Sequence, residues 1–203
     1  MAEPGGTAPG AFDPRGFDPV VGPRRPGHLK RPGRGPLTGQ TLRVRPAQAG
    51  DAPAIFALYR AVLEEGQSFL AAPDELGPQS GLGAVERCAL IAQTDEGSLI
   101  GAILLREAPL RRLQHSRTVE LFVAAGARGS GAGGALLDAA LAWARARPEL
   151  RWLRLSVYAD NDAAIGLYSA RGFVVEGRRP GFSVEPDGQE RDDLLMALDL
   201  RAG

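Results

Sequence analysis

Two residue types are almost missing from the sequence. Cys88 is the single cysteine among 203 residues, which excludes a disulfide scaffold and any metal cluster built on cysteine. Lys30 is the single lysine, so nearly all of the positive charge is arginine. We interpret the arginine excess as coding bias rather than as a sign of function.

The sequence also lacks the features of exported and membrane-embedded proteins. No apolar run approaches the roughly 18 residues of a membrane-spanning helix, which excludes an integral membrane protein. The N-terminus lacks the basic, apolar and small-residue order of a secretory signal. We therefore expect a cytoplasmic protein without a membrane partner. The 24 basic and 24 acidic residues cancel, which argues against general nucleic-acid binding.

The first 40 residues differ in composition from the rest of the chain. Nine glycines and eight prolines occupy this segment, with few apolar residues between them. Such a segment cannot bury enough surface to offset the entropy lost on ordering. The sequence therefore predicts a disordered Pro/Gly/Arg-rich arm over residues 1–40 and a folded domain over 41–203. We interpret its basic cluster, RRPGHLKRPGR, as part of a solvated tail.

Periodicity predicts an alternation of strands and helices after the arm. Apolar residues that alternate favour strands, and a period of 3.6 favours helices. The expected strands cover 41–47, 89–94, 99–107, 118–123, 152–160, 173–179 and 192–200. The expected helices cover 54–65, 135–147 and 161–172, with Asp51 as a cap of the first and a mobile loop at 66–83. This order predicts an α/β (α+β) domain with a mixed sheet.

A glycine-rich stretch, RGSGAGG at 128–134, joins an expected strand to an expected helix. Glycine lets the backbone approach a ligand closely and adopt positive φ angles. A helix N-terminus adds free N–H groups and a partial positive charge. The stretch therefore indicates a site for the phosphate of an anionic ligand.

Three phosphate ligands compete for this loop, beside a plain turn without any ligand. A P-loop nucleotide needs a lysine, which the loop lacks. A dinucleotide fits the spacing of Gly129, Gly131 and Gly134. However, the strand ends well before the loop, and the surrounding units do not repeat as a doubly wound fold requires. The third ligand is the pyrophosphate of coenzyme A.

Two blocks of the sequence resemble the GNAT superfamily of N-acetyltransferases. The first block is Arg or Gln, then x-x-G-x, then Gly or Ala, and it is met here by Arg128-Gly129-Ser130-Gly131-Ala132-Gly133. The second, V-x-x-x-N-x-x-A-x-x-L-Y-x-x-x-G-F, is met at Val157, Asn161, Ala164, Leu167, Tyr168, Gly172 and Phe173. The resemblance covers residues 41–200. Ala125 departs from the family, which commonly has a proline there.

The resemblance implies a fold and a cofactor. The fold is a mostly antiparallel central sheet of about 6–7 strands flanked by helices, with a splayed strand pair at the cofactor site. The co-substrate is acetyl-CoA, and no metal is implied. The backbone of seven residues would hold its pyrophosphate: Arg128, Gly129, Ser130, Gly131, Ala132, Gly133 and Gly134. The strand edge at Leu121, Phe122 and Val123 would pair with the pantetheine amides, and Asn161 would hydrogen-bond the cofactor arm.

The resemblance also implies an N-acetyltransferase in which a primary amine attacks acetyl-CoA directly. Tyr168 would protonate the leaving thiolate, and a phenol pKa near 10 is close to that of an alkyl thiol. The alternative is a tyrosine that only packs beside Leu167. Glu120, an acid inside an apolar strand, is the candidate general base, acting through water. The alternative is an outward-facing glutamate paired with an arginine.

The acceptor is the least defined part of this expectation. We expect a small-molecule or amino-acid-like amine or a peptide amine, chosen by the loops at 66–86 and 180–191, in a chain that can form a homodimer. His115 is expected to be a loop residue without a role. Asp187, Asp192 and Asp193 are expected in a solvated hairpin loop rather than at a metal. The alternative function is a non-catalytic acyl-CoA-binding or sensor module, although such a module has no need of an acid at Tyr168.

Overall fold

The computed structural model describes residues 42–65, 89–185 and 187–202. The expected arm at 1–40, the expected loop at 66–83 and Cys88 lie outside the described residues. All statements below refer to the described part of the chain.

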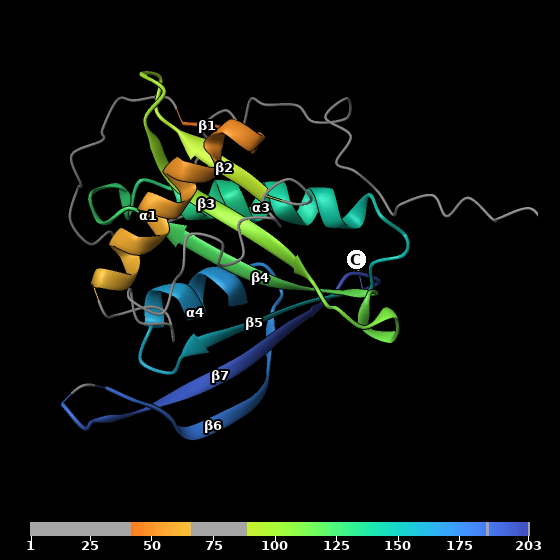
Figure 1. The fold of residues 1–203 in the computed structure, drawn as a ribbon. Coiled ribbons are helices and arrows are strands. Elements are labelled where there is room, and N and C mark those ends of the chain that lie inside the picture. The colour runs from red at the N-terminus through yellow and green to blue at the C-terminus, as the bar shows by residue number, and fades with distance from the viewer. Residues whose placement is uncertain (1–41, 66–88, 186, 203) are drawn as a thin grey trace, which may run out of the picture.

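Seven strands in the described part form one open sheet, in the order β1-β2-β3-β4-β5-β7-β6 (Figure 1). They are β1 (Arg43–Pro46), β2 (Ala89–Gln93), β3 (Leu99–Glu107), β4 (Ser116–Val123), β5 (Trp152–Tyr158), β6 (Val174–Val184) and β7 (Glu190–Asp199). Neighbours are antiparallel except β4 and β5, which run parallel. The predicted mixed and mostly antiparallel sheet is confirmed.

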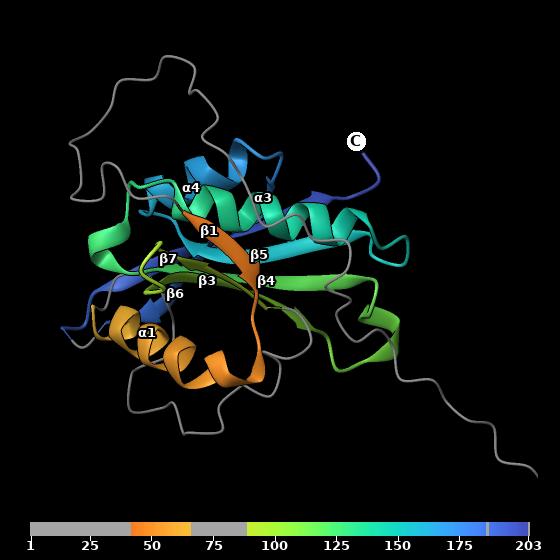
Figure 2. The ribbon, with the colours of Figure 1, turned by 90° about the horizontal axis from the view of Figure 1, so that it is seen from above.

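Three α-helices cover the two faces of this sheet. They are α1 (Ala52–Glu64), α3 (Ala132–Arg145) and α4 (Asp162–Ser169). Figure 2 shows α1 on one face and α3 with α4 on the other. The helix α3 makes the crossover between the parallel strands β4 and β5, a connection that parallel strands require. None of the described helices is long and apolar enough to cross a membrane.

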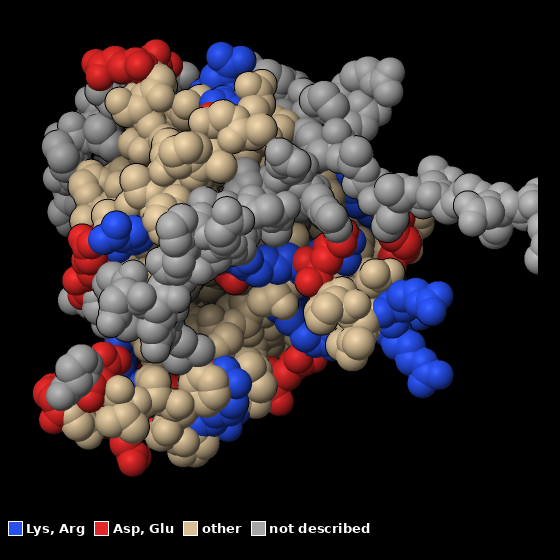
Figure 3. All heavy atoms as spheres, in the orientation of Figure 1, with Lys and Arg blue, Asp and Glu red and all other residues tan. Residues whose placement is uncertain are grey.

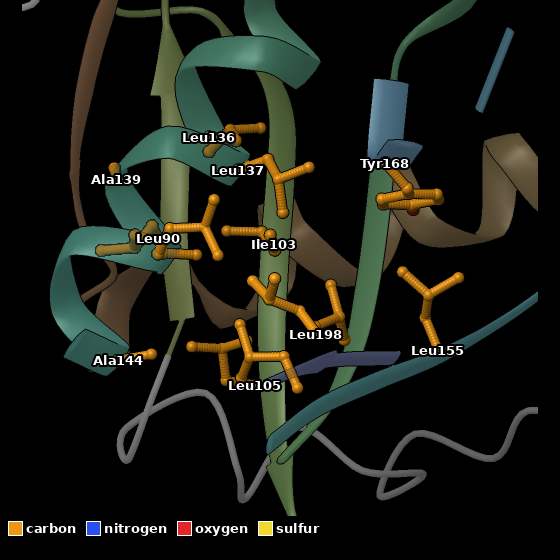
Figure 4. Close-up of a cluster of buried hydrophobic side chains, with 14 of the residues drawn as sticks. Leu90, Ile103, Leu105, Leu136, Leu137, Ala139, Ala144, Leu155, Tyr168 and Leu198 are labelled. Carbon is orange, nitrogen blue, oxygen red and sulfur yellow. The ribbon is translucent and has the colours of Figure 1, made fainter. Parts of the chain in front are cut away.

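The core follows from the alternation of side chains along the strands. The larger cluster lies on the face covered by α3 and α4, and Figure 4 shows part of it. Leu136 and Leu137 of α3 are both fully buried there, and each such side chain contributes about 1.5–3 kcal/mol. A smaller cluster lies under α1 and contains Ile55, Val62 and Phe122. Phe122 is thus on the opposite face of β4 from Val119, which belongs to the larger cluster.

The expected cap at Asp51 is wrong in its detail. The carboxylate makes no cap hydrogen bond to α1. Instead, Asp51 accepts from the N–H of Gln48 at 2.7 Å and forms an ion pair with Arg45 at 2.7 Å. The hydrogen bond from Arg45 is the largest cause of a lowered pKa at Asp51. The side chain therefore ties β1 to the turn before α1, because a nearby cation outcompetes the cap.

The C-terminal hairpin is longer than the sequence predicts. Asp192 and Asp193 lie in β7, which agrees with the expected strand at 192–200 but not with their expected placement in a solvated loop, whereas Asp187 lies in the exposed turn. Asp193 is only 2% exposed. Polar residues are held inside the sheet here because β7 pairs with β5 on one side and β6 on the other. Polar composition alone indicated a loop.

Candidate functional site

The parallel strands β4 and β5 pair at one end and then diverge. Their ladder covers only Ser116 with Trp152, Arg117 with Leu153, and Thr118 with Arg154. The strand β4 continues to Val123 and β5 continues to Tyr158, and Figure 1 shows the two arrows separating. The predicted splayed strand pair is therefore confirmed. In the space-filling view of the same orientation, the surface is hollowed where these strands separate (Figure 3).

Among the described strands, the separation leaves one edge of β4 without a partner beyond Thr118. The other edge of β4 is paired with β3 along the whole segment, as far as Val123 opposite Gly101. Backbone N–H and C=O groups that point into the gap need hydrogen-bond partners. An extended ligand with amide groups, laid along this edge, satisfies them in the way a missing strand would.

The glycine-rich loop ends at the free N-terminus of α3. Gly131 precedes the helix with φ of 94°, and Gly129 has φ of 76°. Both angles lie in the left-handed region that glycine adopts without strain. The N–H of Ala135 is the first to reach a carbonyl one turn back, that of Gly131 at 3.0 Å. Within the first turn, the N–H of Ala132 donates to Oγ of Ser130 at 3.4 Å, whereas those of Gly133 and Gly134 point out of the helix end, where an anion is favoured.

The first turn of α3 meets both β4 and α4. A Cβ placed on Gly133 would lie 3.5 Å from Leu167, 3.7 Å from Val123 and 3.8 Å from Leu121. A Cβ placed on Gly134 would approach the guanidinium of Arg171 at 2.8 Å. Glycine at these positions thus allows the helix end to sit close to the strand edge and to α4. The structure brings the predicted loop, strand edge and second sequence block together at one place.

The side chain of Arg128 contacts two groups of the protein, one on β4 and one just after α1. Its Nε donates to the carbonyl oxygen of Val123 at 3.2 Å, and its guanidinium forms an ion pair with Glu65 at 2.5 Å. The partner Glu65 directly follows α1. The expected contact of the Arg128 backbone with the pyrophosphate stays a prediction, and an anionic ligand that also used the guanidinium would compete with Glu65 for it.

Tyr168 is buried in α4 and packs in the larger core cluster, where Figure 4 shows it near Leu155. Its ring centroid lies 5.6 Å from that of Phe173. Burial raises the pKa of the Tyr168 phenol to about 12, because the phenolate would lose its hydration. The phenol therefore carries its proton throughout the physiological pH range.

Asn161 begins α4 as its N-cap. Its Oδ1 accepts from the N–H of Ala164 at 3.1 Å. This bond satisfies one of the free N–H groups of the helix start. The amide nitrogen is the part of the side chain suited to donating to a ligand, so the predicted contact with the cofactor arm stays a prediction.

Glu120 points to the α1 face of β4, away from the larger cluster. Its Oε1 lies 2.5 Å from Nε of Arg106 on β3, as a close charge contact rather than an aligned hydrogen bond. Its Oε2 is buried and has no hydrogen-bond partner among the described residues. The sequence offered an unnamed arginine as the alternative partner of Glu120, and the structure identifies it as Arg106. The second oxygen of the carboxylate remains for a ligand or water.

Tyr59 of α1 packs against the smaller core cluster under α1 and is absent from the sequence-based candidates. Its ring packs on Phe122 with centroids 5.1 Å apart. Burial raises the pKa of Tyr59 most, and the negative charge of Glu120 raises it further. Tyr59 lies in the expected helix at 54–65, but only the packing of α1 on β4 brings it near Glu120.

A second polar cluster, of which the sequence singled out Asp193 alone, lies on β5, β6 and β7. Ser156 donates its hydroxyl proton to Oδ2 of Asp193 at 2.7 Å. Arg179 donates to the Ser156 hydroxyl oxygen at 3.0 Å and through Nε to Asp193 at 3.1 Å. Its guanidinium also stacks on the ring of Phe182 at 3.3 Å. We call Ser156, Asp193 and Arg179 the serine cluster.

The remaining expected positions contribute less to this site. His115 lies just before β4, and its carbonyl accepts from the N–H of Arg151 at 2.8 Å. The whole of the expected acceptor loop at 66–86 lies outside the described residues. No group of three or more His, Cys, Asp or Glu side chains in the described ranges could hold a metal ion.

Comparison with known proteins agrees with this geometry. The profile of the acetyltransferase (GNAT) family matches residues 54–173. No curated protein matches the chain. A GNAT acetyltransferase from Streptococcus pneumoniae is 26% identical, with a TM-score of 0.71, and the match covers 78% of this chain and 99% of that one.

Two further solved structures share the fold. A GCN5-related N-acetyltransferase from Kribbella flavida is 25% identical, with a TM-score of 0.70 over 78% of this chain and 97% of that one. A GNAT phosphinothricin acetyltransferase from Sinorhizobium meliloti, solved in complex with acetyl-CoA, is 20% identical, with a TM-score of 0.69 over 79% of this chain and 88% of that one. The family profile covers more than half of the chain, and the chain therefore belongs to the acetyltransferase (GNAT) family.

Proposed function

We propose that the chain transfers the acetyl group of acetyl-CoA to a primary amine in the cytoplasm. The observation that carries this proposal is the short β4–β5 ladder, which stops after three pairs beside the free N-terminus of α3. One end of this site suits a phosphate and the other an extended chain of amides. Coenzyme A has both parts, and the structural neighbour from Sinorhizobium meliloti holds acetyl-CoA.

The binding part of the proposal rests on backbone groups. The N–H groups at 128–134 bind the pyrophosphate at the helix N-terminus. The edge at Leu121, Phe122 and Val123 pairs with the pantetheine amides, and Asn161 donates to the cofactor arm. Acetyl-CoA supplies an already activated acyl group, so the chain needs no nucleophile or metal of its own.

Proton transfer is the chemical task left to the side chains. Attack forms the nitrogen–carbon bond, breaks the carbon–sulfur bond and leaves the electron pair on sulfur. Glu120 takes the amine proton through water, which fits its buried oxygen Oε2 without a partner. Tyr168 gives its proton to the sulfur. With a pKa of about 12, it starts fully protonated but is a weaker acid than a phenol in water.

An assay of thiol release tests this function. Acetyl-CoA is incubated with four acceptors: L-alanine, L-lysine, 1,4-diaminobutane and trialanine. We expect thiol release with at least one of them, an N-acetyl product by mass spectrometry, and a fall in kcat of about 10²–10⁴ in Tyr168→Phe. If acetyl-CoA binds but none of the four acceptors causes thiol release, the result contradicts the proposal and favours the acyl-CoA sensor.

A further inference from the structure

The serine cluster faces Glu120 across the gap between β4 and β5. Thr118 and Arg154 are the last register pair of the two parallel strands. Two residues further along each strand are Glu120 and Ser156, and side chains two apart point to the same face. Leu155 and Val157 belong to the opposite face and the larger core cluster. Glu120 and Ser156 therefore stand at the same level on the two sides of the opening.

The hydrogen bonds of Ser156 determine what its hydroxyl can still do. Its single proton is donated to Asp193, whose carboxylate only accepts. One lone pair of the oxygen receives the N–H of Arg179. A serine hydroxyl has one donor and two acceptor sites, so one acceptor site remains. The exposed Ser156 thus offers an acceptor to whatever enters the gap and has no proton left to donate.

Asp193 and Arg179 hold the hydroxyl in this state. The side chain of Asp193 is 3% exposed, so it is fixed within the sheet, and the side chain of Arg179 is 36% exposed. Arg179 contacts Asp193 and Ser156 together while its guanidinium stacks on Phe182. Because this arginine neutralises the aspartate, the cluster presents an oriented hydroxyl oxygen rather than a net charge.

We propose that Ser156 is a specificity-determining residue that accepts a hydrogen bond from the attacking amine, with Asp193 and Arg179 as positioning residues. The inference rests on the proposed N-acetyl transfer. A neutral primary amine has one lone pair and two N–H groups. With its lone pair directed at the thioester in the gap, one N–H is directed toward Glu120 and the other toward Ser156. A secondary amine lacks the second N–H and leaves the Ser156 oxygen without a donor.

The test compares a primary amine with its N-methyl derivative. The first probe is the acceptor of the four-member panel that gives the highest kcat/KM. The second probe is the same compound with one methyl group on the attacking amine nitrogen. In Ser156→Ala we expect the primary-to-secondary ratio of kcat/KM to fall about tenfold, the size of one hydrogen bond. We expect KM for acetyl-CoA to stay unchanged. Ser156→Thr, which keeps the hydroxyl, restores the ratio.

Ser116→Ala is the matched control. Ser116 lies on the same face of β4 and accepts from Arg154 at 3.2 Å, but at the paired end of the two strands. We expect the wild-type ratio in this variant. An unchanged ratio in Ser156→Ala, or an equal fall in Ser116→Ala, overturns the assignment of Ser156 while N-acetyl transfer stands. A wild-type chain that acetylates no panel amine refutes N-acetyl transfer, and the assignment of Ser156 fails with it.

Discussion

Arg106 and Glu120 lie diagonally across β3 and β4, and their ion pair uses only one oxygen of the carboxylate. Oε1 faces the guanidinium, and the buried Oε2 has no hydrogen-bond partner in the part of the chain that the structure describes. A buried acceptor left unsatisfied costs about 1–3 kcal/mol, so a water or substrate N–H is favoured there. The pair thus orients Glu120 and leaves one atom available for the proton of the amine.

Replacement of Glu120 by Gln tests its role as the base. The amide keeps the size of the side chain but does not take up a proton, so we expect kcat/KM for the amine to fall about 10²–10⁴-fold. Steady-state thiol release at pH 7–9 measures the change. The matched control is Glu107→Gln, which removes another β3–β4 ion pair, that with Arg117 at 2.9 Å. Equal losses of activity in the two variants would refute the assignment of Glu120.

The buried phenol of Tyr168 links stability to pH. Its pKa rises from about 10 in the unfolded chain to about 12 in the folded one. A raised folded pKa means that stability is fully present below pH 10 and is lost as pH rises toward 12. A shift of this size corresponds to about 3 kcal/mol.

Urea unfolding from pH 8 to 11 measures this linkage. The wild-type chain should lose stability relative to Tyr168→Phe as pH rises above 10. The comparison with phenylalanine cancels the contribution of every other group that titrates in this range. A difference between the two chains that stays constant across this range would show that the phenol is not desolvated.

Gly131 tests the geometry of the phosphate loop. Its φ of 94° is unfavourable for alanine, although a Cβ there meets nothing within 4 Å. We expect Gly131→Ala to cost about 1–2 kcal/mol of unfolding free energy and to weaken acetyl-CoA binding. Gly126→Ala is the control, since its Cβ is equally unhindered and its φ lies outside the positive range. Titration calorimetry that shows equal affinities for the two variants would contradict the loop assignment.

Glu65 competes with an incoming phosphate for Arg128. Their contact of 2.5 Å must weaken before the guanidinium can turn to an anionic ligand. We therefore expect Glu65→Gln to bind acetyl-CoA about 2–5-fold more tightly at low salt, because a surface ion pair contributes up to about 1 kcal/mol. The gain should disappear in the double variant with Arg128→Gln. If the double variant still binds acetyl-CoA more tightly than Arg128→Gln alone, Glu65 acts through a group other than Arg128 and the prediction is wrong.

The secondary structure could be predicted from the sequence because it depends on local patterns. The segment at 99–107 is a short apolar run and the expected strand at 152–160 alternates apolar and polar residues, and the strands β3 and β5 form there. The start of α3 at Ala132 was missed by three residues, because Gly133 and Gly134 are poor helix formers. They fit there since α3 needs close contact with β4 and α4.

The polar clusters of the site could not be predicted from local patterns. Arg106 meets Glu120 only through the register of β3 with β4. Asp193 reaches Ser156 only because β7 inserts between β5 and β6. Both contacts join residues distant in sequence, so no period or short motif contains them. The glycine loop, in contrast, is contiguous, and its chemistry was visible in the sequence.

The binding of acetyl-CoA between β4 and β5 is the central claim, and isothermal titration calorimetry tests it most directly. Acetyl-CoA is titrated into the full chain, with NADH and ATP titrated separately. We predict a single site with micromolar affinity for acetyl-CoA and no binding of the other two. No heat from acetyl-CoA with a folded sample, or equally tight binding of NADH, would contradict the account.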